Sequence, residues 1–290
     1  MKSWAVLVGM GLAAIAPAQV PDVKLRLDAV MSYRQDRNGD AKIRYYSVFG
    51  QFSTVALRFE LEPGFTGFLS QKLERIANDA DRGSVDEAFV EDEGIWRVGK
   101  QYLPFGSGEI LRESVMAVRA DTDLIVEALP IRIARADAGP RRQRGGVVRL
   151  GTNPGVSIAI GEHFGINGTS LTQIRRPEET PGAGRGWRKA FGFDVRQRYR
   201  LVEVKGEAVI LRDGHTPLDQ NTAIFDVSAT YAPTGFSTMT LGFTREVQRS
   251  TDIFRLVGEV EATENVFLRP FARMRSGRLW DLGIEVRVRL

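Results

Sequence analysis

The sequence contains no cysteine and only two histidines. Without cysteine the chain can form neither a disulfide framework nor a thiolate metal site. His163 and His215 stand in the loop-like stretches Gly-Glu-His-Phe-Gly and Asp-Gly-His-Thr-Pro, and neither has a serine at the facing spacing that a nucleophile and its base would need. We therefore expect no catalytic residue, no metal and no cofactor.

Long hydrophobic runs and blocks of one charge sign are also missing. Beyond the N-terminus no window approaches the 18 or more apolar residues of a membrane-spanning helix. The 40 lysine and arginine residues are interleaved with 36 aspartate and glutamate residues, so they form no basic patch or basic helix. These patterns argue against a helical membrane span and against a nucleic-acid partner.

The N-terminus has the three parts of a secretory signal peptide. Lys2 supplies the positive charge, residues 4–15 are apolar, and Ala16-Pro17-Ala18 is a small-x-small cleavage pattern. The apolar part is too short to span a bilayer, which needs about 20 residues. We expect a signal peptide over residues 1–18 and a single domain over residues 19–290, exported to the outer membrane of a diderm bacterium.

Alternation of apolar and polar residues dominates the remaining chain. In the first such stretch one face carries Leu25, Leu27, Ala29, Met31 and Tyr33, and the other carries Lys24, Arg26, Asp28 and Ser32. The stretches 54–62 and 238–244 follow the same period of two, which predicts two-faced β-strands. From Trp280 the last strand places Trp280, Leu282, Ile284, Val286, Val288 and Leu290 on one face.

Short and long connectors alternate between these strands, as in outer-membrane barrels, which have short turns on one rim and longer loops on the other. The predicted fold is all-β: an antiparallel transmembrane β-barrel of 16 strands, with 12–18 as the range that the connectors allow. The count of 16 requires residues 42–62 to be one bent strand with an irregularity near residues 50–53. A hairpin there would make the count odd.

Residues 84–114 resemble the central part of bacterial outer-membrane porins. The resemblance rests on Glu-Ala-Phe-Val, a short acidic turn, Val-Gly-Lys-Gln and then Pro104-Phe105-Gly106. In general porins a strand ends at this place and a loop folds into the channel, so the resemblance implies a constriction loop near residues 103–113. The same stretch is similar to phosphate-selective porins, and the last strand is similar to the C-terminal assembly signal of barrels, although it ends in Leu290 and not in an aromatic residue.

The resemblance and the strand faces together give candidate residues for the pore wall and its constriction. The candidates that follow Tyr102 in the sequence belong to the implied loop. Lys100 matches the basic residue of the Gly-basic motif, and the remaining candidates lie on charged strand faces. The candidates are Lys100, Glu109, Arg112, Glu113, Arg97, Arg119, Arg58 and Glu60. The alternative for each of them is a solvated rim residue or an ion pair within the wall.

The sequence thus favours an outer-membrane porin through which small hydrophilic solutes or ions diffuse passively, without enzymatic activity. A near-balance of charges along the expected wall favours a general pore. An anion- or phosphate-preferring porin is the first alternative. A barrel enzyme and a soluble β-rich binding protein are the others. The expected partners are the lipid bilayer and the solutes, and the resemblance implies a homotrimer.

Overall fold

The computed structural model describes residues 23–38, 41–47, 53–73, 85–92, 94–111, 114–124, 129–136, 144–162, 187–213, 221–248 and 250–290. These residues form seventeen β-strands, and none of them is helical. Within the same ranges no helix is long and apolar enough to cross a membrane. The strands in chain order are β1 (Val23–Asn38), β2 (Ala41–Ser47), β3 (Thr54–Glu62), β4 (Phe65–Lys72), β5 (Val85–Asp92), β6 (Trp96–Tyr102), β7 (Ser114–Leu124), β8 (Leu129–Ala136), β9 (Arg144–Leu150), β10 (Gly155–Glu162), β11 (Trp187–Tyr199), β12 (Val202–Asp213), β13 (Asn221–Thr234), β14 (Ser237–Glu246), β15 (Thr251–Thr263), β16 (Val266–Arg275) and β17 (Arg278–Arg289).

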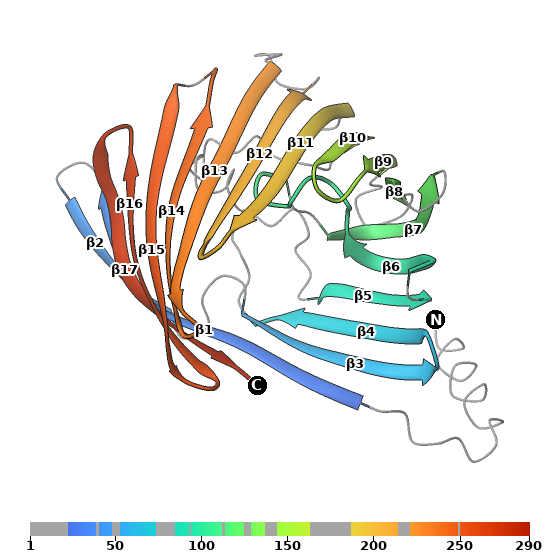
Figure 1. The fold of residues 1–290 in the computed structure, drawn as a ribbon, viewed down its shortest axis with the longest axis horizontal. Coiled ribbons are helices and arrows are strands. Elements are labelled where there is room, and N and C mark those ends of the chain that lie inside the picture. Colours follow the sequence, from blue (N-terminus) through green and yellow to red (C-terminus); the bar gives the residue numbers. More distant parts are fainter. Residues whose placement is uncertain are drawn as a thin grey trace, which may run out of the picture.

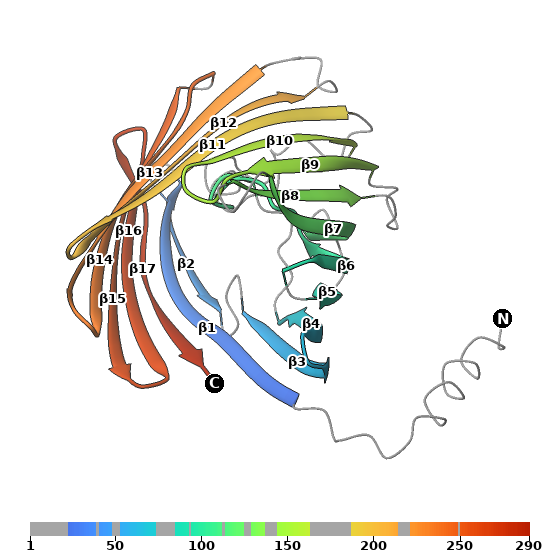
Figure 2. The same cartoon turned by 45° about the vertical axis from the view of Figure 1, so that its right-hand side comes forward.

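The strands close into a barrel in chain order. From β3 to β17 each strand pairs antiparallel with the next one along the chain, and β17 pairs with β1 from Asp28↔Arg289 to Asp36↔Asp281. Leu27 and Leu290 exchange two backbone hydrogen bonds at the seam, of 2.8 and 2.9 Å. Figures 1 and 2 show the strands following one another around the wall. The predicted all-β, antiparallel barrel is confirmed.

One wall position is occupied by two strands. The C-terminal part of β1 pairs with β2, as in Ser32↔Ser47. Its N-terminal part pairs with β3, as in Asp28↔Thr54. β2 and β3 therefore continue one another along β1, with a register shift between them, so the seventeen strands fill sixteen positions around the wall. The expected bent strand over residues 42–62 is confirmed in this form, although residues 48–52 lie outside the described part.

The two rims differ in their connections. On one rim the connections between paired strands have two to four residues, with two-residue turns at 63–64, 200–201, 235–236 and 264–265. The start of β1 lies at this rim, because Val23 pairs with Phe59 near the turn at 63–64, and Leu290 reaches it beside Leu27. The connections of 24 and 7 residues at 163–186 and 214–220 leave the opposite rim. We call these the short-turn rim and the long-loop rim.

The outer face of the wall is apolar and the inner face is charged. Large apolar side chains are exposed outward all round the barrel, for example Leu25 (65%), Ile210 (55%) and Leu241 (56%). On the inner face, arginines bind carboxylates of strands one or two positions away, and Arg149 on β9 lies 2.6 Å from Asp194 on β11. The same arrangement joins Arg255 to Asp226, Arg273 to Asp281 and Arg287 to Asp28. This is the reverse of a water-soluble barrel, which turns its apolar face inward.

Trp280 does not follow the face expected for it. The register between β16 and β17 shifts at this point, because Arg273 pairs with Asp281 while Met274 pairs with Leu279. Trp280 is the extra residue of this bulge, and it packs against the buried apolar cluster inside the barrel. A bulge puts two successive side chains on one face. The expectation that Trp280 shares the outer face with Leu282 is therefore wrong.

Candidate functional site

The segment Leu103–Leu111 leaves the wall at the end of β6 and turns into the barrel. Pro104 has no backbone N–H to donate to a neighbouring strand. Gly106 and Gly108 have φ angles of +56° and +79°, which residues with a side chain rarely adopt. The strand therefore stops at Tyr102, and the chain becomes free to fold back over the inner face.

Three apolar side chains fix the segment to the inside of the wall. Phe105 is 4% exposed, Ile110 is fully buried and Leu111 is 5% exposed. They pack in one cluster with inward-facing residues of seven strands, which are Val115, Ala117, Val147, Ala159, Ala190, Val209, Leu211, Ile224 and Ile253. The segment covers the β7–β13 side of the interior and extends to β15. The inner faces of β1, β3, β16 and β17 contribute none of these residues.

Gly192 on β11 makes room for the ring of Phe105. A Cβ atom at Gly192 would lie 2.8 Å from the Cζ atom of Phe105, closer than carbon atoms can approach. The small side chains of Ala159 and Ala190 lie beside it on the same inner face. Small residues on two neighbouring strands thus leave room at the wall for the ring of Phe105.

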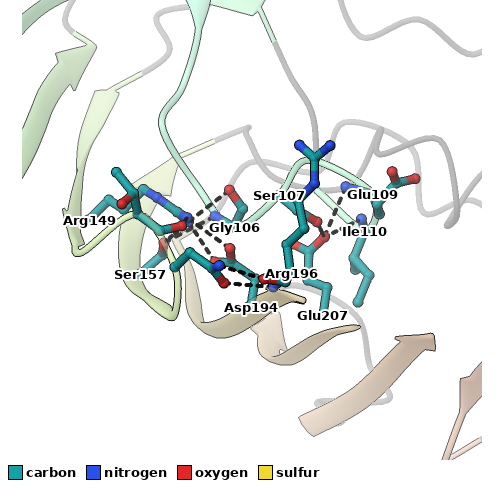
Figure 3. Close-up of polar contacts among 11 residues, drawn as sticks. Gly106, Ser107, Glu109, Ile110, Arg149, Ser157, Asp194, Arg196 and Glu207 are labelled. Carbon is teal, nitrogen blue, oxygen red and sulfur yellow. Dashed lines mark hydrogen bonds and ion pairs between the residues drawn. The ribbon is translucent and has the colours of Figure 1, made fainter. Parts of the chain in front are cut away.

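Glu207 on β12 binds the next turn of the segment. Its Oε2 atom accepts hydrogen bonds from the Ser107 hydroxyl at 2.6 Å, from the Glu109 N–H at 2.9 Å and from the Ile110 N–H at 3.2 Å. Glu207 is only 3% exposed. Figure 3 shows its side chain beneath this turn of the segment. One buried carboxylate oxygen therefore satisfies three donors of a segment that has no strand partner.

Arg149 on β9 makes a second attachment, at Gly106. Its Nη1 atom donates to the Gly106 carbonyl oxygen at 2.8 Å, and the Gly106 N–H donates to the Ser157 hydroxyl at 3.0 Å. The same guanidinium forms a two-pronged pair with Asp194, at 2.6 and 2.8 Å. Because Asp194 holds Arg149 in place (Figure 3), the guanidinium binds the segment in a fixed geometry.

Two of the predicted pore residues, Arg97 and Arg119, lie together on the inner face. They are direct cross-strand neighbours on β6 and β7. Arg97 binds Glu91 on β5 at 2.6 Å, and Arg119 binds Asp121. The four charges form a row along the wall in which each arginine has an acidic partner. For each candidate charge, the sequence left open the alternative of an ion pair within the wall. Arg97 and Arg119 correspond to that alternative.

Arg58 and Glu60 also face inward, whereas Lys100 does not. Arg58 and Glu60 alternate with the outward-facing Leu57 on β3, and both are exposed. Lys100 pairs with Met116, which is exposed on the outer face, and its Nζ atom donates to the Val85 carbonyl oxygen. The structure therefore separates Lys100 from the other charges, and we leave it out of the channel wall proposed below.

The remaining predicted residues belong to the inward segment or directly follow it. Glu109 lies in the segment; its N–H binds Glu207, while its carboxylate extends away from that contact (Figure 3). Arg112 and Glu113 lie outside the described residues, as do His163 and His215. Among the residues that the structure does describe, no group of three or more histidine, aspartate or glutamate side chains could hold a metal ion.

Sequence reasoning missed Glu207 as an attachment point. Glu207 follows Gly206 in a plain alternating strand, and the residues that it binds lie about a hundred positions earlier in the chain. The alternation shows that Glu207 faces the polar side. Nothing near it in the sequence indicates that a distant segment covers it.

No family model and no curated protein matches the sequence. Solved structures of outer-membrane proteins do match. OmpT of Vibrio cholerae with loop L8 deleted has a TM-score of 0.65 at 11% identity, over 94% of this chain and 100% of that one. An anion-selective porin from Comamonas acidovorans gives 0.61 at 11%, over 93% and 99%. OmpF of Salmonella typhi gives 0.59 at 13%, over 92% and 97%. The chain thus has the fold of bacterial outer-membrane porins, as the resemblance of residues 84–114 implied.

Proposed function

We propose that the chain forms a water-filled channel through the outer membrane and lets small hydrophilic solutes or ions diffuse passively. The observation that carries the proposal is the segment 103–111, which folds inside the barrel and is held there by Glu207 and Arg149. A segment fixed to the inner wall narrows the lumen without closing it. The resemblance of residues 84–114 to porins assigns the same role to this loop.

The two faces of the wall support this reading. The outer face exposes apolar side chains on strand after strand, which suits contact with lipid tails. A barrel of sixteen positions is too wide for side chains to fill, so water occupies what the segment leaves free. The inner faces of β1, β3 and β16 contribute no residue to the buried cluster and then border the open part of the channel.

The proposed constriction lies between the segment and this uncovered wall. Glu109 supplies charge from the segment, and Arg58 and Glu60 supply it from β3. The sequence assigns Arg112 and Glu113, which lie outside the described residues, to the same constriction. Arg97 and Arg119 belong to the wall near the turn between β5 and β6, and their ion pairs with Glu91 and Asp121 reduce their effect on passing ions. A mixture of both charge signs favours a general pore over a strongly selective one.

Single-channel recording of the refolded protein in a planar bilayer tests the proposal. We expect stepwise conductance that grows in proportion to salt concentration, and a small reversal potential under a salt gradient. Circular dichroism of the same sample provides the control for folding. If a sample with the β-sheet spectrum inserts into the bilayer and yields no conductance steps, the channel function is wrong.

Anion preference is the second candidate, because basic residues gather on the inner face near the short-turn rim. Lys24 lies directly opposite Arg58, and Arg26 is the next inward-facing residue of β1. A reversal potential of the sign for anion selectivity, reduced in the double variant Arg26→Gln and Arg58→Gln, would support this candidate. Adding phosphate to the chloride solution in the same recording tests a phosphate preference, which would appear as a reduced chloride current.

The membrane setting implies two further properties. Cleavage after Ala18 would give a mature protein that begins at Gln19, which N-terminal sequencing of protein from the outer-membrane fraction checks.

We also propose a homotrimer. β4, β5, β6, β8, β9 and β10 have only 7–8 residues, fewer than the 9–11 of a typical spanning strand, so a second copy could cover this low part of the wall. Light scattering of the detergent-solubilised protein measures the number of copies.

We do not assign an enzymatic activity or a soluble binding role to the barrel. A soluble protein would have to cover the exposed apolar outer face with another layer. It would also stay monodisperse without detergent. Loss of solubility after detergent removal distinguishes the membrane channel from that alternative.

A further inference from the structure

Two basic residues of the outer face lie side by side at the long-loop rim. Lys189 on β11 pairs directly with Arg212 on β12, and both side chains are exposed. Direct cross-strand neighbours have Cβ atoms about 5 Å apart, and like charges in this position repel one another. Among the side chains that the structure describes, neither residue has a hydrogen bond or an ion pair, so no described carboxylate offsets this repulsion.

A third basic residue of the same face shows the contrast. Arg245 on β14 also faces outward, because it pairs with the exposed Phe225. It has a carboxylate 3.5 Å away, at Asp252 on the neighbouring strand. Arg245 therefore resembles the neutralised arginines of the inner wall. Lys189 and Arg212 differ from it in presenting two positive charges together to the surroundings.

The surface next to this pair is apolar. Lys189 pairs with Ile160 on β10, and the next outward-facing pair towards the short-turn rim is Phe191 with Ile210. These three side chains are exposed by 43%, 47% and 55%. A molecule that lies here contacts apolar side chains along the wall and two positive charges at its end nearest the long-loop rim. That combination suits an amphiphile with an anionic head.

The height of the pair fits the head-group level of a membrane. Tyr199, which is 69% exposed, lies on the same face of β11 at the short-turn rim, ten residues from Lys189. Ten residues of strand extend about 33 Å. At the usual strand tilt this corresponds to about 25 Å across the membrane, the height of the apolar band of outer-membrane barrels. Lys189 and Arg212 then lie where the lipid phosphates are.

We infer that Lys189 and Arg212 form a binding site for the phosphate-bearing head group of an anionic lipid, whose acyl chains lie along Ile160, Phe191 and Ile210. The phosphate oxygens accept hydrogen bonds from both cations and remove their repulsion. The site goes beyond the channel function, since it lies on the outside of the wall and none of its residues faces the lumen. It rests on the proposed membrane setting.

Lipid titration of the detergent-solubilised protein, followed by native mass spectrometry, tests the site. The probes are dilauroyl phosphatidic acid and, as the zwitterionic comparison, dilauroyl phosphatidylcholine. For the double variant Lys189→Gln and Arg212→Gln we expect phosphatidic acid to bind about 30-fold more weakly, and about five-fold more weakly for each single variant. Binding of phosphatidylcholine should not change. The conservative variants Lys189→Arg and Arg212→Lys should keep the affinity for phosphatidic acid.

The matched control is the double variant Arg198→Gln and Arg200→Gln, which removes two positive charges from β11 and its turn at the other rim. It should bind phosphatidic acid like the unaltered protein. Equal losses in both double variants would mean non-specific attraction, and an unchanged affinity in the Lys189 and Arg212 variants would overturn the site. Complete displacement of phosphatidic acid by millimolar inorganic phosphate would also overturn the site, because a free anion without acyl chains would then bind equally well. Channel conductance is measured separately, so failure of one proposal does not hide failure of the other.

Discussion

Glu207 shows how one buried carboxylate can order a segment that has no strand partner. Three donors of residues 107–110 converge on its Oε2 atom, from one hydroxyl and two backbone N–H groups. Buried N–H groups without an acceptor are costly, and a charged acceptor gives the stronger hydrogen bonds. A neighbouring glycine completes the arrangement, since a Cβ at Gly106 would lie 2.0 Å from the other carboxylate oxygen. The position therefore requires an acid on β12 and a glycine opposite it.

Replacing Glu207 by alanine should loosen the segment. The variant loses all three hydrogen bonds and should unfold with about 2 kcal/mol less free energy. Open-channel current noise should increase, because the segment moves more often towards the lumen. Guanidinium unfolding followed by tryptophan fluorescence measures the first effect, and single-channel recording the second. The matched control is Glu203→Ala, which removes an inward-facing acid of β12 that binds Arg196 and Lys205 and not the segment. A quiet channel in Glu207→Ala would contradict the assigned role.

Substitution of Gly192 tests sterically whether the Phe105 ring holds the segment against the wall. In Gly192→Ala the new methyl group overlaps the ring of Phe105, so the ring must move or the wall must bulge. Such overpacking costs about 1–3 kcal/mol. We expect a lower unfolding free energy together with noisier current. Gly206→Ala is the control, because its Cβ would meet only Val195 Cγ1, at an ordinary 3.5 Å. Equal behaviour of the two variants would show that Phe105 does not hold the segment.

Single residues are where sequence reasoning was weakest. The faces of Arg58, Glu60, Arg97 and Arg119 follow from alternation. Lys100 shares the outer face with Val98 and Met116, so its match to the Gly-basic motif misplaced it. Trp280 changes face because of a bulge, which the sequence marks only by the two adjacent apolar residues Leu279 and Trp280. A period of two fixes a face only as long as the register is unbroken.

At the scale of elements, the segment 103–111 is held from two separate hairpins. Arg149 and Ser157 of the β9–β10 hairpin bind Gly106, and Glu207 of the β11–β12 hairpin binds residues 107–110. Asp194 connects the two, because it holds Arg149 from β11. The attachments lie one residue apart on the segment, so each keeps the other in place. We expect the element to leave the wall only when both are lost.

The double variant Arg149→Lys with Glu207→Ala tests this cooperation. Lysine keeps the charge, but it cannot bind Asp194 with two prongs and also reach the Gly106 carbonyl oxygen. Mean conductance should change little in either single variant and clearly in the double variant, beyond the sum of the single effects. A double-mutant cycle on mean conductance gives this coupling. Strict additivity would mean that the two hairpins hold the segment independently.

The elements themselves could largely be predicted from the sequence. The stop at Tyr102 follows from Pro104 and the glycines after it, and the division of one wall strand into β2 and β3 follows from the irregularity near residues 50–53. The attachment of the segment could not be predicted, because it joins Gly106 to Arg149 and Ser107 to Glu207 across 43 and 100 positions. Contacts at such separation leave no local pattern in a single sequence.

The described strands form a closed ring. Among them β2 is paired only with β1, while every other strand is paired on both sides, as a barrel in lipid requires, because an unpaired edge would leave backbone groups without hydrogen bonds. Ion pairs between arginines and acids one or two strands apart add contacts along the inner face. The seam between β1 and β17 is built like every other strand pair, although it joins the two ends of the described chain.

A circular permutant tests whether the seam is an ordinary strand pair. Val23 and Leu290 lie at the same rim, and four residues separate Val23 from Leu27, the partner of Leu290. That distance is about 13 Å, which a linker of about six residues spans. With new ends opened in the short turn between Gly235 and Phe236, we expect the protein to refold with the same circular dichroism and the same conductance. Opening the ring between Gly206 and Glu207 is the control, and it should fail, because it cuts β12 in mid-wall and leaves backbone groups unpaired in lipid. If the first permutant fails as well, the ends contribute more to barrel closure than their pairing accounts for.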